Sequence, residues 1–263
     1  MPYKFILTHL DGPVTTLTLN RPERINALNA DIGEEILGAV KTFEHADHQR
    51  VLIIAGAGRG FCSGDDLKGD GRPRQDPAQQ LDRIKRWLTG PGRWPLIAKA
   101  FLELPKPVIA MMHGVAYGAG FEIALATDFR IVSQDATLAF PVNQRALLWG
   151  VAQLPRLVGV ARAKEILMLH NVLKADEAYA LGLVTEVVPR EQLEDRTMEV
   201  AQQLANGPYR TYAGIKKGLN QSLDSTLYQA YEYQAYALAI NAYSSPAAEE
   251  GRNAFLEKRT ASF

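Results

Sequence analysis

Two glycine-rich bends carry the residue types best suited to chemistry. The first spans residues 59–67 (RGFCSGDDL) and the second spans residues 113–122 (HGVAYGAGFE). A glycine-rich turn at the start of a helix leaves backbone N–H groups unpaired and aimed at one spot. Two such turns facing each other would bind a carbonyl oxygen that gains negative charge during a reaction. Glu122, in the first turn of the helix expected after the second bend, could move a proton beside that oxygen.

The segments before the two bends predict the strands that position them. Residues 51–55 and 108–112 are short apolar runs, and the first is continuous enough to be buried on both faces. Residues 14–19 alternate as a strand does, and Asn29 is expected to cap an amphipathic helix between these strands. The order strand, helix, strand predicts an α/β arrangement.

Further along the chain, the pattern becomes mainly helical. Pro208 fits the start of one helix, and Asp224 fits the cap of a tyrosine-rich helix that continues to Tyr243. We therefore predict an α/β core over residues 1–190 and a helical region over residues 191–263. The remaining expected elements are short strands at 129–132, 137–140 and 185–188, a polar surface segment at 69–77, a helix at 79–88 and a breaker-rich stretch at 89–95.

Composition excludes several classes of protein. The 263 residues are 47% hydrophobic, which is enough for a sizeable core. The formal net charge of +0 shows none of the excess of basic residues that is typical of nucleic-acid-binding proteins. The one cysteine, Cys62, excludes an internal disulfide and fits a reducing compartment. Because we find neither a signal-peptide pattern nor a run suited to a membrane span, we expect a cytoplasmic protein without a membrane partner.

Five segments, in this order, resemble the crotonase superfamily, also called the enoyl-CoA hydratase/isomerase family. The resemblance covers nearly the whole chain, and its strength comes from the order of the segments more than from any one of them. The segments are 20–28 (NRPERINAL), 61–67 (FCSGDDL), 114–122 (GVAYGAGFE), 178–184 (AYALGLV) and 250–259 (EGRNAFLEKR).

The resemblance implies a fold, an assembly and a substrate class. The implied fold is an α/β spiral of ββα units with a C-terminal helical trimerisation region, and the implied assembly is a homotrimer or homohexamer. The substrates would be acyl-CoA thioesters, as in fatty acid metabolism, so coenzyme A would enter as part of the substrate. No separate cofactor and no metal are expected.

The same resemblance assigns roles around the bends. The backbone N–H groups of Asp65 and Ala119 would stabilise the enolate oxygen, each worth roughly 3–4 kcal/mol, and Glu122 would be the first catalytic glutamate of a hydratase. The Asp65 side chain is expected to face solvent, the alternative being an acid–base role.

The second glutamate of a hydratase is missing. Residues 140–150 (FPVNQRALLWG) contain no carboxylate, so its position falls on Val142, Asn143 or Gln144. An amide can orient a water molecule but cannot exchange a proton with it at neutral pH.

Other residues match the family's substrate contacts or could line the acyl pocket. Arg21, Arg24 and Lys68 are candidate phosphate contacts, whereas Phe255 and Lys258 could reach a neighbouring subunit's coenzyme A. The other matched positions are Ala27, Ser63, Asp66, Leu67 and Gly118, and the weaker candidates are His113, Tyr117, Trp87, Trp94 and Trp149.

Several functions stay open at this point. A hydratase adding water to a 2-enoyl-CoA is the first hypothesis, and an isomerase needs only one base. A thioester hydrolase, another lyase or a non-catalytic acyl-CoA binding protein are further alternatives. A short-chain dehydrogenase would match the glycines at 114–120 and the Tyr212-x-x-x-Lys216 pair, but its glycine turn follows the first strand of the fold.

Overall fold

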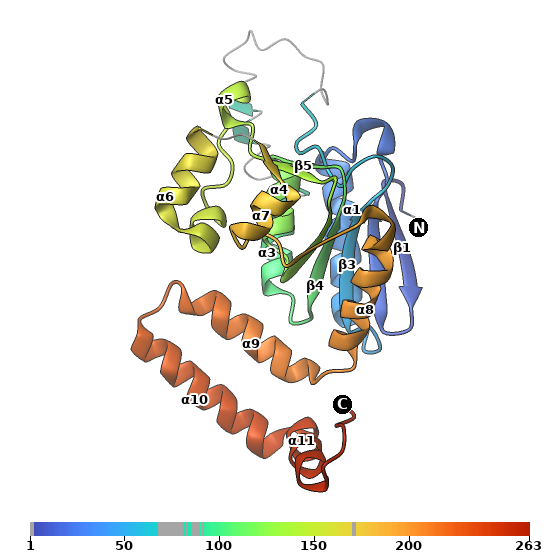
Figure 1. Ribbon diagram of the computed structural model, residues 1–263, viewed down its shortest axis with the longest axis vertical. Helices are drawn as coiled ribbons and strands as arrows, with labels where there is room; N and C mark the ends of the chain where they lie inside the picture. The colour runs from blue at the N-terminus through green and yellow to red at the C-terminus, as the bar shows by residue number, and fades with distance from the viewer. Residues whose placement is uncertain (1–2, 68–80, 83, 86–89, 91, 170–171) are drawn as a thin grey trace.

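The computed structural model describes residues 3–67, 81–82, 84–85, 90, 92–169 and 172–263. Within these residues, the largest sheet has six strands in the order β1-β2-β3-β4-β6-β9 (Figure 1). Only β1 and β2 pair antiparallel, and every later neighbour is parallel. The strands are β1 (Ile6–Asp11), β2 (Val14–Leu19), β3 (Val51–Gly56), β4 (Val108–Met112), β6 (Phe129–Ser133) and β9 (Glu186–Val188).

A second sheet adjoins the first at the end where the glycine bends lie. It consists of β5 (Val115–Tyr117), β7 (Thr137–Ala139) and β8 (Val172–Lys174), and β7 pairs parallel with β5 and antiparallel with β8. Because β4 and β5 are separated only by His113 and Gly114, the chain passes directly from the large sheet into the small one.

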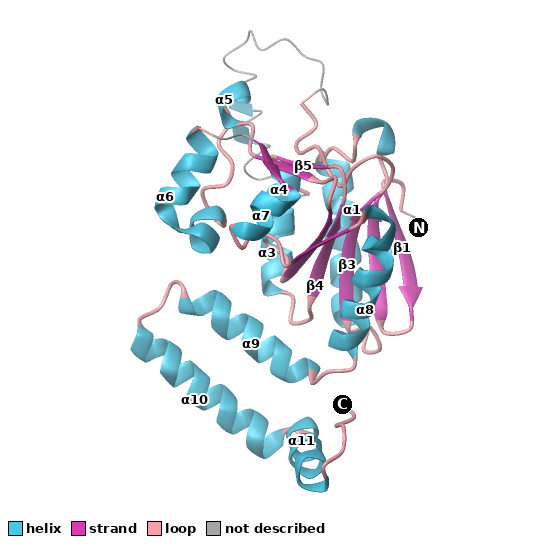
Figure 2. Ribbon diagram, viewed as in Figure 1, coloured by secondary structure: helices cyan, strands magenta, loops and turns pink. Residues whose placement is uncertain are grey.

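Helices cover both faces of the large sheet and extend away from it at the C-terminal end (Figure 2). They are α1 (Ala30–His45), α3 (Trp94–Glu103), α4 (Ala119–Leu125), α5 (Val142–Arg145), α6 (Leu154–Met168), α7 (Ala175–Ala180), α8 (Leu193–Ala205), α9 (Tyr209–Ser222), α10 (Leu227–Ser244) and α11 (Pro246–Glu257), with short 3-10 turns at Pro22–Arg24 and Arg190–Gln192. None of the described helices combines the length and the apolar content that crossing a bilayer requires.

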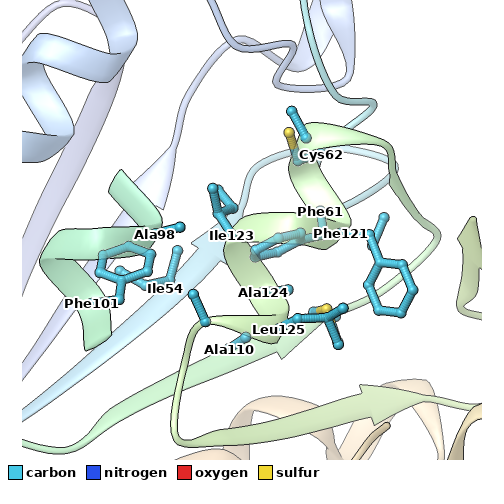
Figure 3. Close-up of a cluster of buried hydrophobic side chains, with 14 of the residues drawn as sticks. Ile54, Phe61, Cys62, Ala98, Phe101, Ala110, Phe121, Ile123, Ala124 and Leu125 are labelled. Atoms are coloured by element: carbon cyan, nitrogen blue, oxygen red, sulfur yellow. The ribbon is translucent and has the colours of Figure 1, made fainter. Parts of the chain in front are cut away.

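The apolar strand β3 is buried on both faces, as predicted. Leu52 and Ile54 belong to the core that contains α1, α3 and α4, whereas Val51 and Ile53 pack in the core of α8. This alternation follows from the two-residue period of a strand. Helix α4 is buried along its whole length, and Figure 3 shows its Ile123 near the side chains of β3 and α3.

Several predicted element boundaries are confirmed, and one predicted cap is wrong. The side chain of Asn29 accepts a hydrogen bond from the Ile32 amide at 3.1 Å and so caps α1. Helix α10 is capped by Thr226, whose hydroxyl accepts from the Gln229 amide. Asp224 instead pairs with Arg156 at 2.6 Å. A carboxylate bound to another helix is not available as a cap.

Several described elements were not predicted, among them α3, β5 and β8. Residues 89–95 contain breakers, yet α3 starts at Trp94 and accommodates Pro95 in its first turn, where the missing N–H costs nothing. Strands β5 and β8 are only three residues long, and their pairing partners are distant in sequence. The predicted segment at 69–77 lies outside the described residues, as does most of the predicted helix at 79–88.

Helix α8 packs on the large sheet, whereas α9 and α10 lie largely away from the sheets. Neither α9 nor α10 contains a buried residue, and α10 exposes Tyr228, Tyr236 and Tyr243. The division at residue 190 stays a prediction.

Candidate active site

Backbone hydrogen bonds join the two glycine bends side by side. The Phe61 amide donates to the His113 carbonyl at 2.9 Å, and the Cys62 amide donates to Val115 at 3.0 Å. The Tyr117 amide returns a bond to the Cys62 carbonyl at 2.9 Å. The convergence predicted from the sequence is therefore present, and β5 is the element that produces it.

Two glycines permit this close approach. A Cβ on Gly64 would lie 2.7 Å from the Tyr117 carbonyl oxygen and 3.3 Å from the Ala119 nitrogen, and Gly64 has φ +94°. A Cβ on Gly120 would lie 2.7 Å from the sulfur of Cys62. Larger residues at either position would push the bends apart. The same geometry shows that the backbone before Asp65 lies against the start of α4.

The amides of Asp65 and Ala119 are two unpaired donors at this junction. The neighbours of Asp65 bond to Leu28: Gly64 accepts from the Leu28 amide and Asp66 donates to the Leu28 carbonyl, each at 2.8 Å. Within the described part of the chain, neither the Asp65 nor the Ala119 N–H has a hydrogen-bond acceptor. Ala119 lacks one because it is the first residue of α4. Two donors are thus free to bind a ligand oxygen.

A cavity of about 160 Å³ opens at the same place. Its walls come from both bends, from β7 and β8, and from the segment that joins β7 to α6. The described residues that line it are Ser63, Gly64, Asp65, Leu67, Tyr117, Gly118, Ala139, Pro141, Gln144, Arg145, Trp149 and Val172.

Glu122 is buried next to this region, with 2% of the residue exposed. Its Oε2 accepts a hydrogen bond from the Gly150 amide at 2.8 Å. Burial raises the pKa of Glu122 from its ordinary 4.5 to about 7, and the Gly150 hydrogen bond partly opposes that rise. A carboxyl group of this kind can both take up and release a proton near neutral pH.

The Asp65 side chain does not point into solvent, which corrects the expectation from the sequence. Its Oδ2 accepts a hydrogen bond from the indole nitrogen of Trp149 at 3.1 Å. Burial raises the pKa of Asp65, and the indole hydrogen bond partly lowers it again. The carboxylate therefore forms part of the cavity wall.

Of the three residues considered for the missing second glutamate, one reaches the cavity. Val142 packs against the hydrophobic core, and the Asn143 amide donates to the Met168 carbonyl at 2.7 Å. Gln144 lines the cavity next to Arg145. Arg145 was not predicted to be a site residue.

Arg21, a predicted phosphate contact, is already engaged within the chain. Its guanidinium pairs with Asp66 at 2.8 Å and donates to the Ala27 carbonyl at 2.5 Å. Arg21, Ala27 and Asp66, which were all predicted to contact the substrate, are thus bonded to one another within the chain. Arg24 is exposed, and its carbonyl accepts from the Ser63 hydroxyl at 3.0 Å.

The remaining predicted contacts are spread over the molecule. Leu67 and Gly118 line the cavity, whereas Phe255 and Lys258 are exposed in the C-terminal segment. Lys68 lies outside the described residues, as does Trp87.

The weaker candidates divide into packed residues and cavity residues. His113 is buried, its Nε2 lies 2.8 Å from the Gly58 carbonyl, and burial lowers its pKa. Trp94 is partly buried against the core. Tyr117 and Trp149 line the cavity, and the Tyr117 hydroxyl lies 3.1 Å from that of Thr137. Gly150, which binds Glu122, was missed because a backbone donor leaves no signature in the side-chain sequence.

Among the described residues, no group of three or more His, Cys, Asp or Glu side chains could hold a metal ion. Lys216, part of the dehydrogenase-like pair, is bonded to Asp128 at 2.7 Å. Neither observation adds a second reaction centre to the cavity.

Comparison with known proteins identifies the family of the chain. The family model for enoyl-CoA hydratase/isomerase matches residues 10–263. The 1,2-epoxyphenylacetyl-CoA isomerase of Escherichia coli is 35% identical over 99% of this chain and 98% of its own length. The crotonyl-CoA hydratase of Syntrophomonas wolfei is 30% identical over 100% and 99%.

Solved structures give the same result for the fold. A crystal structure of an enoyl-CoA hydratase from Mycobacterium smegmatis superposes with a TM-score of 0.87 at 30% identity, covering 98% of both chains. The crotonase-type α/β fold expected from the sequence is therefore confirmed, with its C-terminal helices. The chain belongs to the enoyl-CoA hydratase/isomerase family, the crotonase superfamily, and is an enzyme of that family.

Proposed function

We propose that this enzyme adds water to the double bond of a trans-2-enoyl-CoA thioester, in the syn sense. The observation that carries the proposal is the pair of unpaired amides, Asp65 N–H and Ala119 N–H, on two interlocked bends beside a cavity. The crotonyl-CoA hydratase of S. wolfei supports the same choice. Coenzyme A would enter as part of the substrate, and we propose no resident cofactor.

The two amides would act on the thioester carbonyl. When water attacks the β-carbon, electrons of the double bond move onto the carbonyl oxygen, which becomes an enolate oxygen. Two fixed N–H donors stabilise that charge without reorganising, and each is worth roughly 3–4 kcal/mol. Glu122 would take the proton of the attacking water, because its pKa of about 7 lets it act as a base at neutral pH.

A second candidate is a single-base isomerase that moves a double bond along the acyl chain. It is favoured by the absence of any carboxylate among residues 142–144. One carboxylate that removes a proton and returns it elsewhere would be sufficient for this reaction. The E. coli relative is named as an isomerase, though of an epoxide substrate.

Substrate contacts and assembly are proposed on weaker grounds. Because Arg21 is paired with Asp66, we assign coenzyme A phosphate binding first to the exposed Arg24. Phe255 and Lys258 are exposed and would serve a neighbouring subunit. The exposed tyrosines of α10 would be covered in a homotrimer or homohexamer, and the single cysteine fits a cytoplasmic enzyme.

Two substrates distinguish these reactions. The purified enzyme is incubated separately with a trans-2-enoyl-CoA and a 3-enoyl-CoA, and the absorbance of the conjugated thioester is followed. Hydration removes absorbance from the first, and isomerisation creates it from the second. If neither substrate reacts, whether its acyl group is short, long or aryl, the proposed function is contradicted.

A further inference from the structure

The acidic side chain that reaches the cavity is that of Asp65. Among the described residues lining the cavity, Asp65 is the only carboxylate, and Arg145 is the only other charged residue. Glu122 is not part of this lining and is 2% exposed. A group that gives a proton to a carbon of the acyl chain must touch that chain, so the position of Asp65 is informative.

The Asp65 carboxylate is held in one orientation. Trp149 donates to its Oδ2 at 3.1 Å, and the indole itself is buried. The ring packs against Gly118, where a Cβ would lie 3.5 Å from it. Within the described chain no hydrogen bond is made to Oδ1 of Asp65, so that oxygen is available to a ligand.

Consecutive residues hold the two carboxylates. The side chain of Trp149 binds Asp65, and the amide of the next residue, Gly150, binds Glu122. Two acidic groups are thus held by neighbouring residues of one segment, although residues 142–144 contain none. Addition of water needs one group to accept a proton from the water and one to deliver a proton to the α-carbon.

We propose that Asp65 is a second catalytic residue, whose carboxyl group delivers the proton to the substrate's α-carbon while its backbone N–H binds the thioester oxygen. The inference rests on the proposed hydratase function. One residue can perform both roles because the reacting atoms are close together along each molecule. In Asp65 the carboxyl carbon is three bonds from the amide nitrogen, and in the substrate the α-carbon is two bonds from the thioester oxygen. Burial raises the pKa of Asp65, which favours the protonated form that this role requires.

The proton balance closes over one turnover. The water oxygen bonds to the β-carbon while Glu122 takes a water proton, and the double-bond electrons form the enolate. The carboxylic acid of Asp65 then gives its proton to the α-carbon, and the enolate returns to a thioester. Transfer of one proton from Glu122 to Asp65 through solvent restores the starting state, so that the net change is addition of water.

Asp65→Asn tests the proposal, because it keeps the backbone donor and the size of the side chain but cannot exchange a proton. We expect kcat with a trans-2-enoyl-CoA to fall at least about 100-fold, with KM within about threefold. Asp135→Asn, in an exposed turn between β6 and β7, is the matched control and should keep the wild-type rate. A rate for Asp65→Asn within about threefold of wild type would overturn the proposal.

Trp149 is a positioning residue that acts through Asp65, and a double-mutant cycle tests this. Trp149→Phe should lower kcat about tenfold or more in the wild-type background and add little to Asp65→Asn. Equal effects in both backgrounds would mean that the indole only packs, and would contradict the proposal. If Asp65→Asn does not fold, unchanged kcat in Trp149→Phe overturns the proposal instead.

The outcomes for the proposed function and for this inference are distinguishable. A wild-type enzyme inactive on all enoyl-CoA esters would refute both. An active wild type with an unimpaired Asp65→Asn variant would refute only the inference.

Discussion

Each of the two glycine bends holds one unpaired amide at or next to a residue that lines the cavity, yet different forces hold the two bends. The second bend runs into α4, so the Ala119 N–H is free because the first turn of any helix lacks acceptors. The first bend has no helix after it in the described residues. Asp65 is placed instead by bonds that its neighbours make to Leu28, and the buried amide of Asn26 donates to three carbonyls of the bend and its flank.

The side chains of the two donor residues also lie in different surroundings. Ala119 is fully buried, so its methyl group belongs to the core. Asp65 lines the cavity, so its side chain can take part in chemistry. The second bend is therefore set by local helix geometry, whereas the first depends on long-range contacts. We expect changes in the first bend to affect both the amide and the reaction.

The largest loss of turnover is expected from Gly64→Ala. The new Cβ would meet the Tyr117 carbonyl at 2.7 Å and force the first bend away from the second. Displacing one oxyanion donor lowers kcat by about 10²–10³-fold, which steady-state kinetics would measure. Gly12→Ala is the matched control, since Gly12 also has a positive φ but has nothing within 4 Å. Wild-type turnover in Gly64→Ala would show that the contact between the bends is not needed.

Glu122→Gln removes the base of the second bend and leaves the amides in place. Turnover should fall at least about 100-fold. Glu103→Gln, an exposed residue of α3, controls for the loss of a carboxylate elsewhere. A rate near that of wild type would contradict the role of Glu122.

The pH dependence sharpens the same assignment. As a base Glu122 must be ionised, so kcat should rise as Glu122 ionises around its pKa of about 7, whereas ionisation of the proposed acid Asp65 should lower kcat. Because this pKa is raised above its ordinary 4.5 in the folded state, the folded protein binds the proton more tightly. The free energy of unfolding should therefore fall as pH rises from about 4.5 to about 7. Urea unfolding across this range should show a smaller fall for Glu122→Gln, and an equal fall would contradict the shift.

A smaller effect, on stability, is expected from Asn26→Ala. Asn26 is fully buried and its amide donates to the carbonyls of Ala57, Gly60 and Phe61. Leaving buried acceptors unpaired should lower the free energy of unfolding by about 2–4 kcal/mol. Asn220→Ala, which removes one exposed bond to the Leu102 carbonyl, should cost under about 1 kcal/mol in the same urea titration. Equal losses would mean that the first bend does not depend on Asn26.

The smallest effect is expected in the chemical reactivity of the Cys62 thiol. Burial raises the pKa of this thiol to about 12, and the thiolate is the reactive form. Ellman's reagent at pH 8 should leave the folded enzyme unmodified and react once after unfolding. Rapid reaction of the native protein would show that the two bends separate in solution.

Local signals predicted the elements of the fold, and distant contacts decided the site. The Asn29 cap and the buried strand β3 follow from residues within one turn or one strand, and both are present. The three-residue strands β5 and β8 follow from pairing across the fold, which no local pattern contains. The orientation of Asp65 depends on Trp149, which is 84 residues away, so a solvent-facing carboxylate was the natural but wrong expectation.

The most direct test of the account is a crystal structure with a slowly reacting acyl-CoA thioester bound. We predict that the thioester oxygen lies about 2.7–3.1 Å from both the Asp65 nitrogen and the Ala119 nitrogen. A bound thioester whose oxygen contacts neither amide, or only one of them, would contradict the claim that the two bends act together.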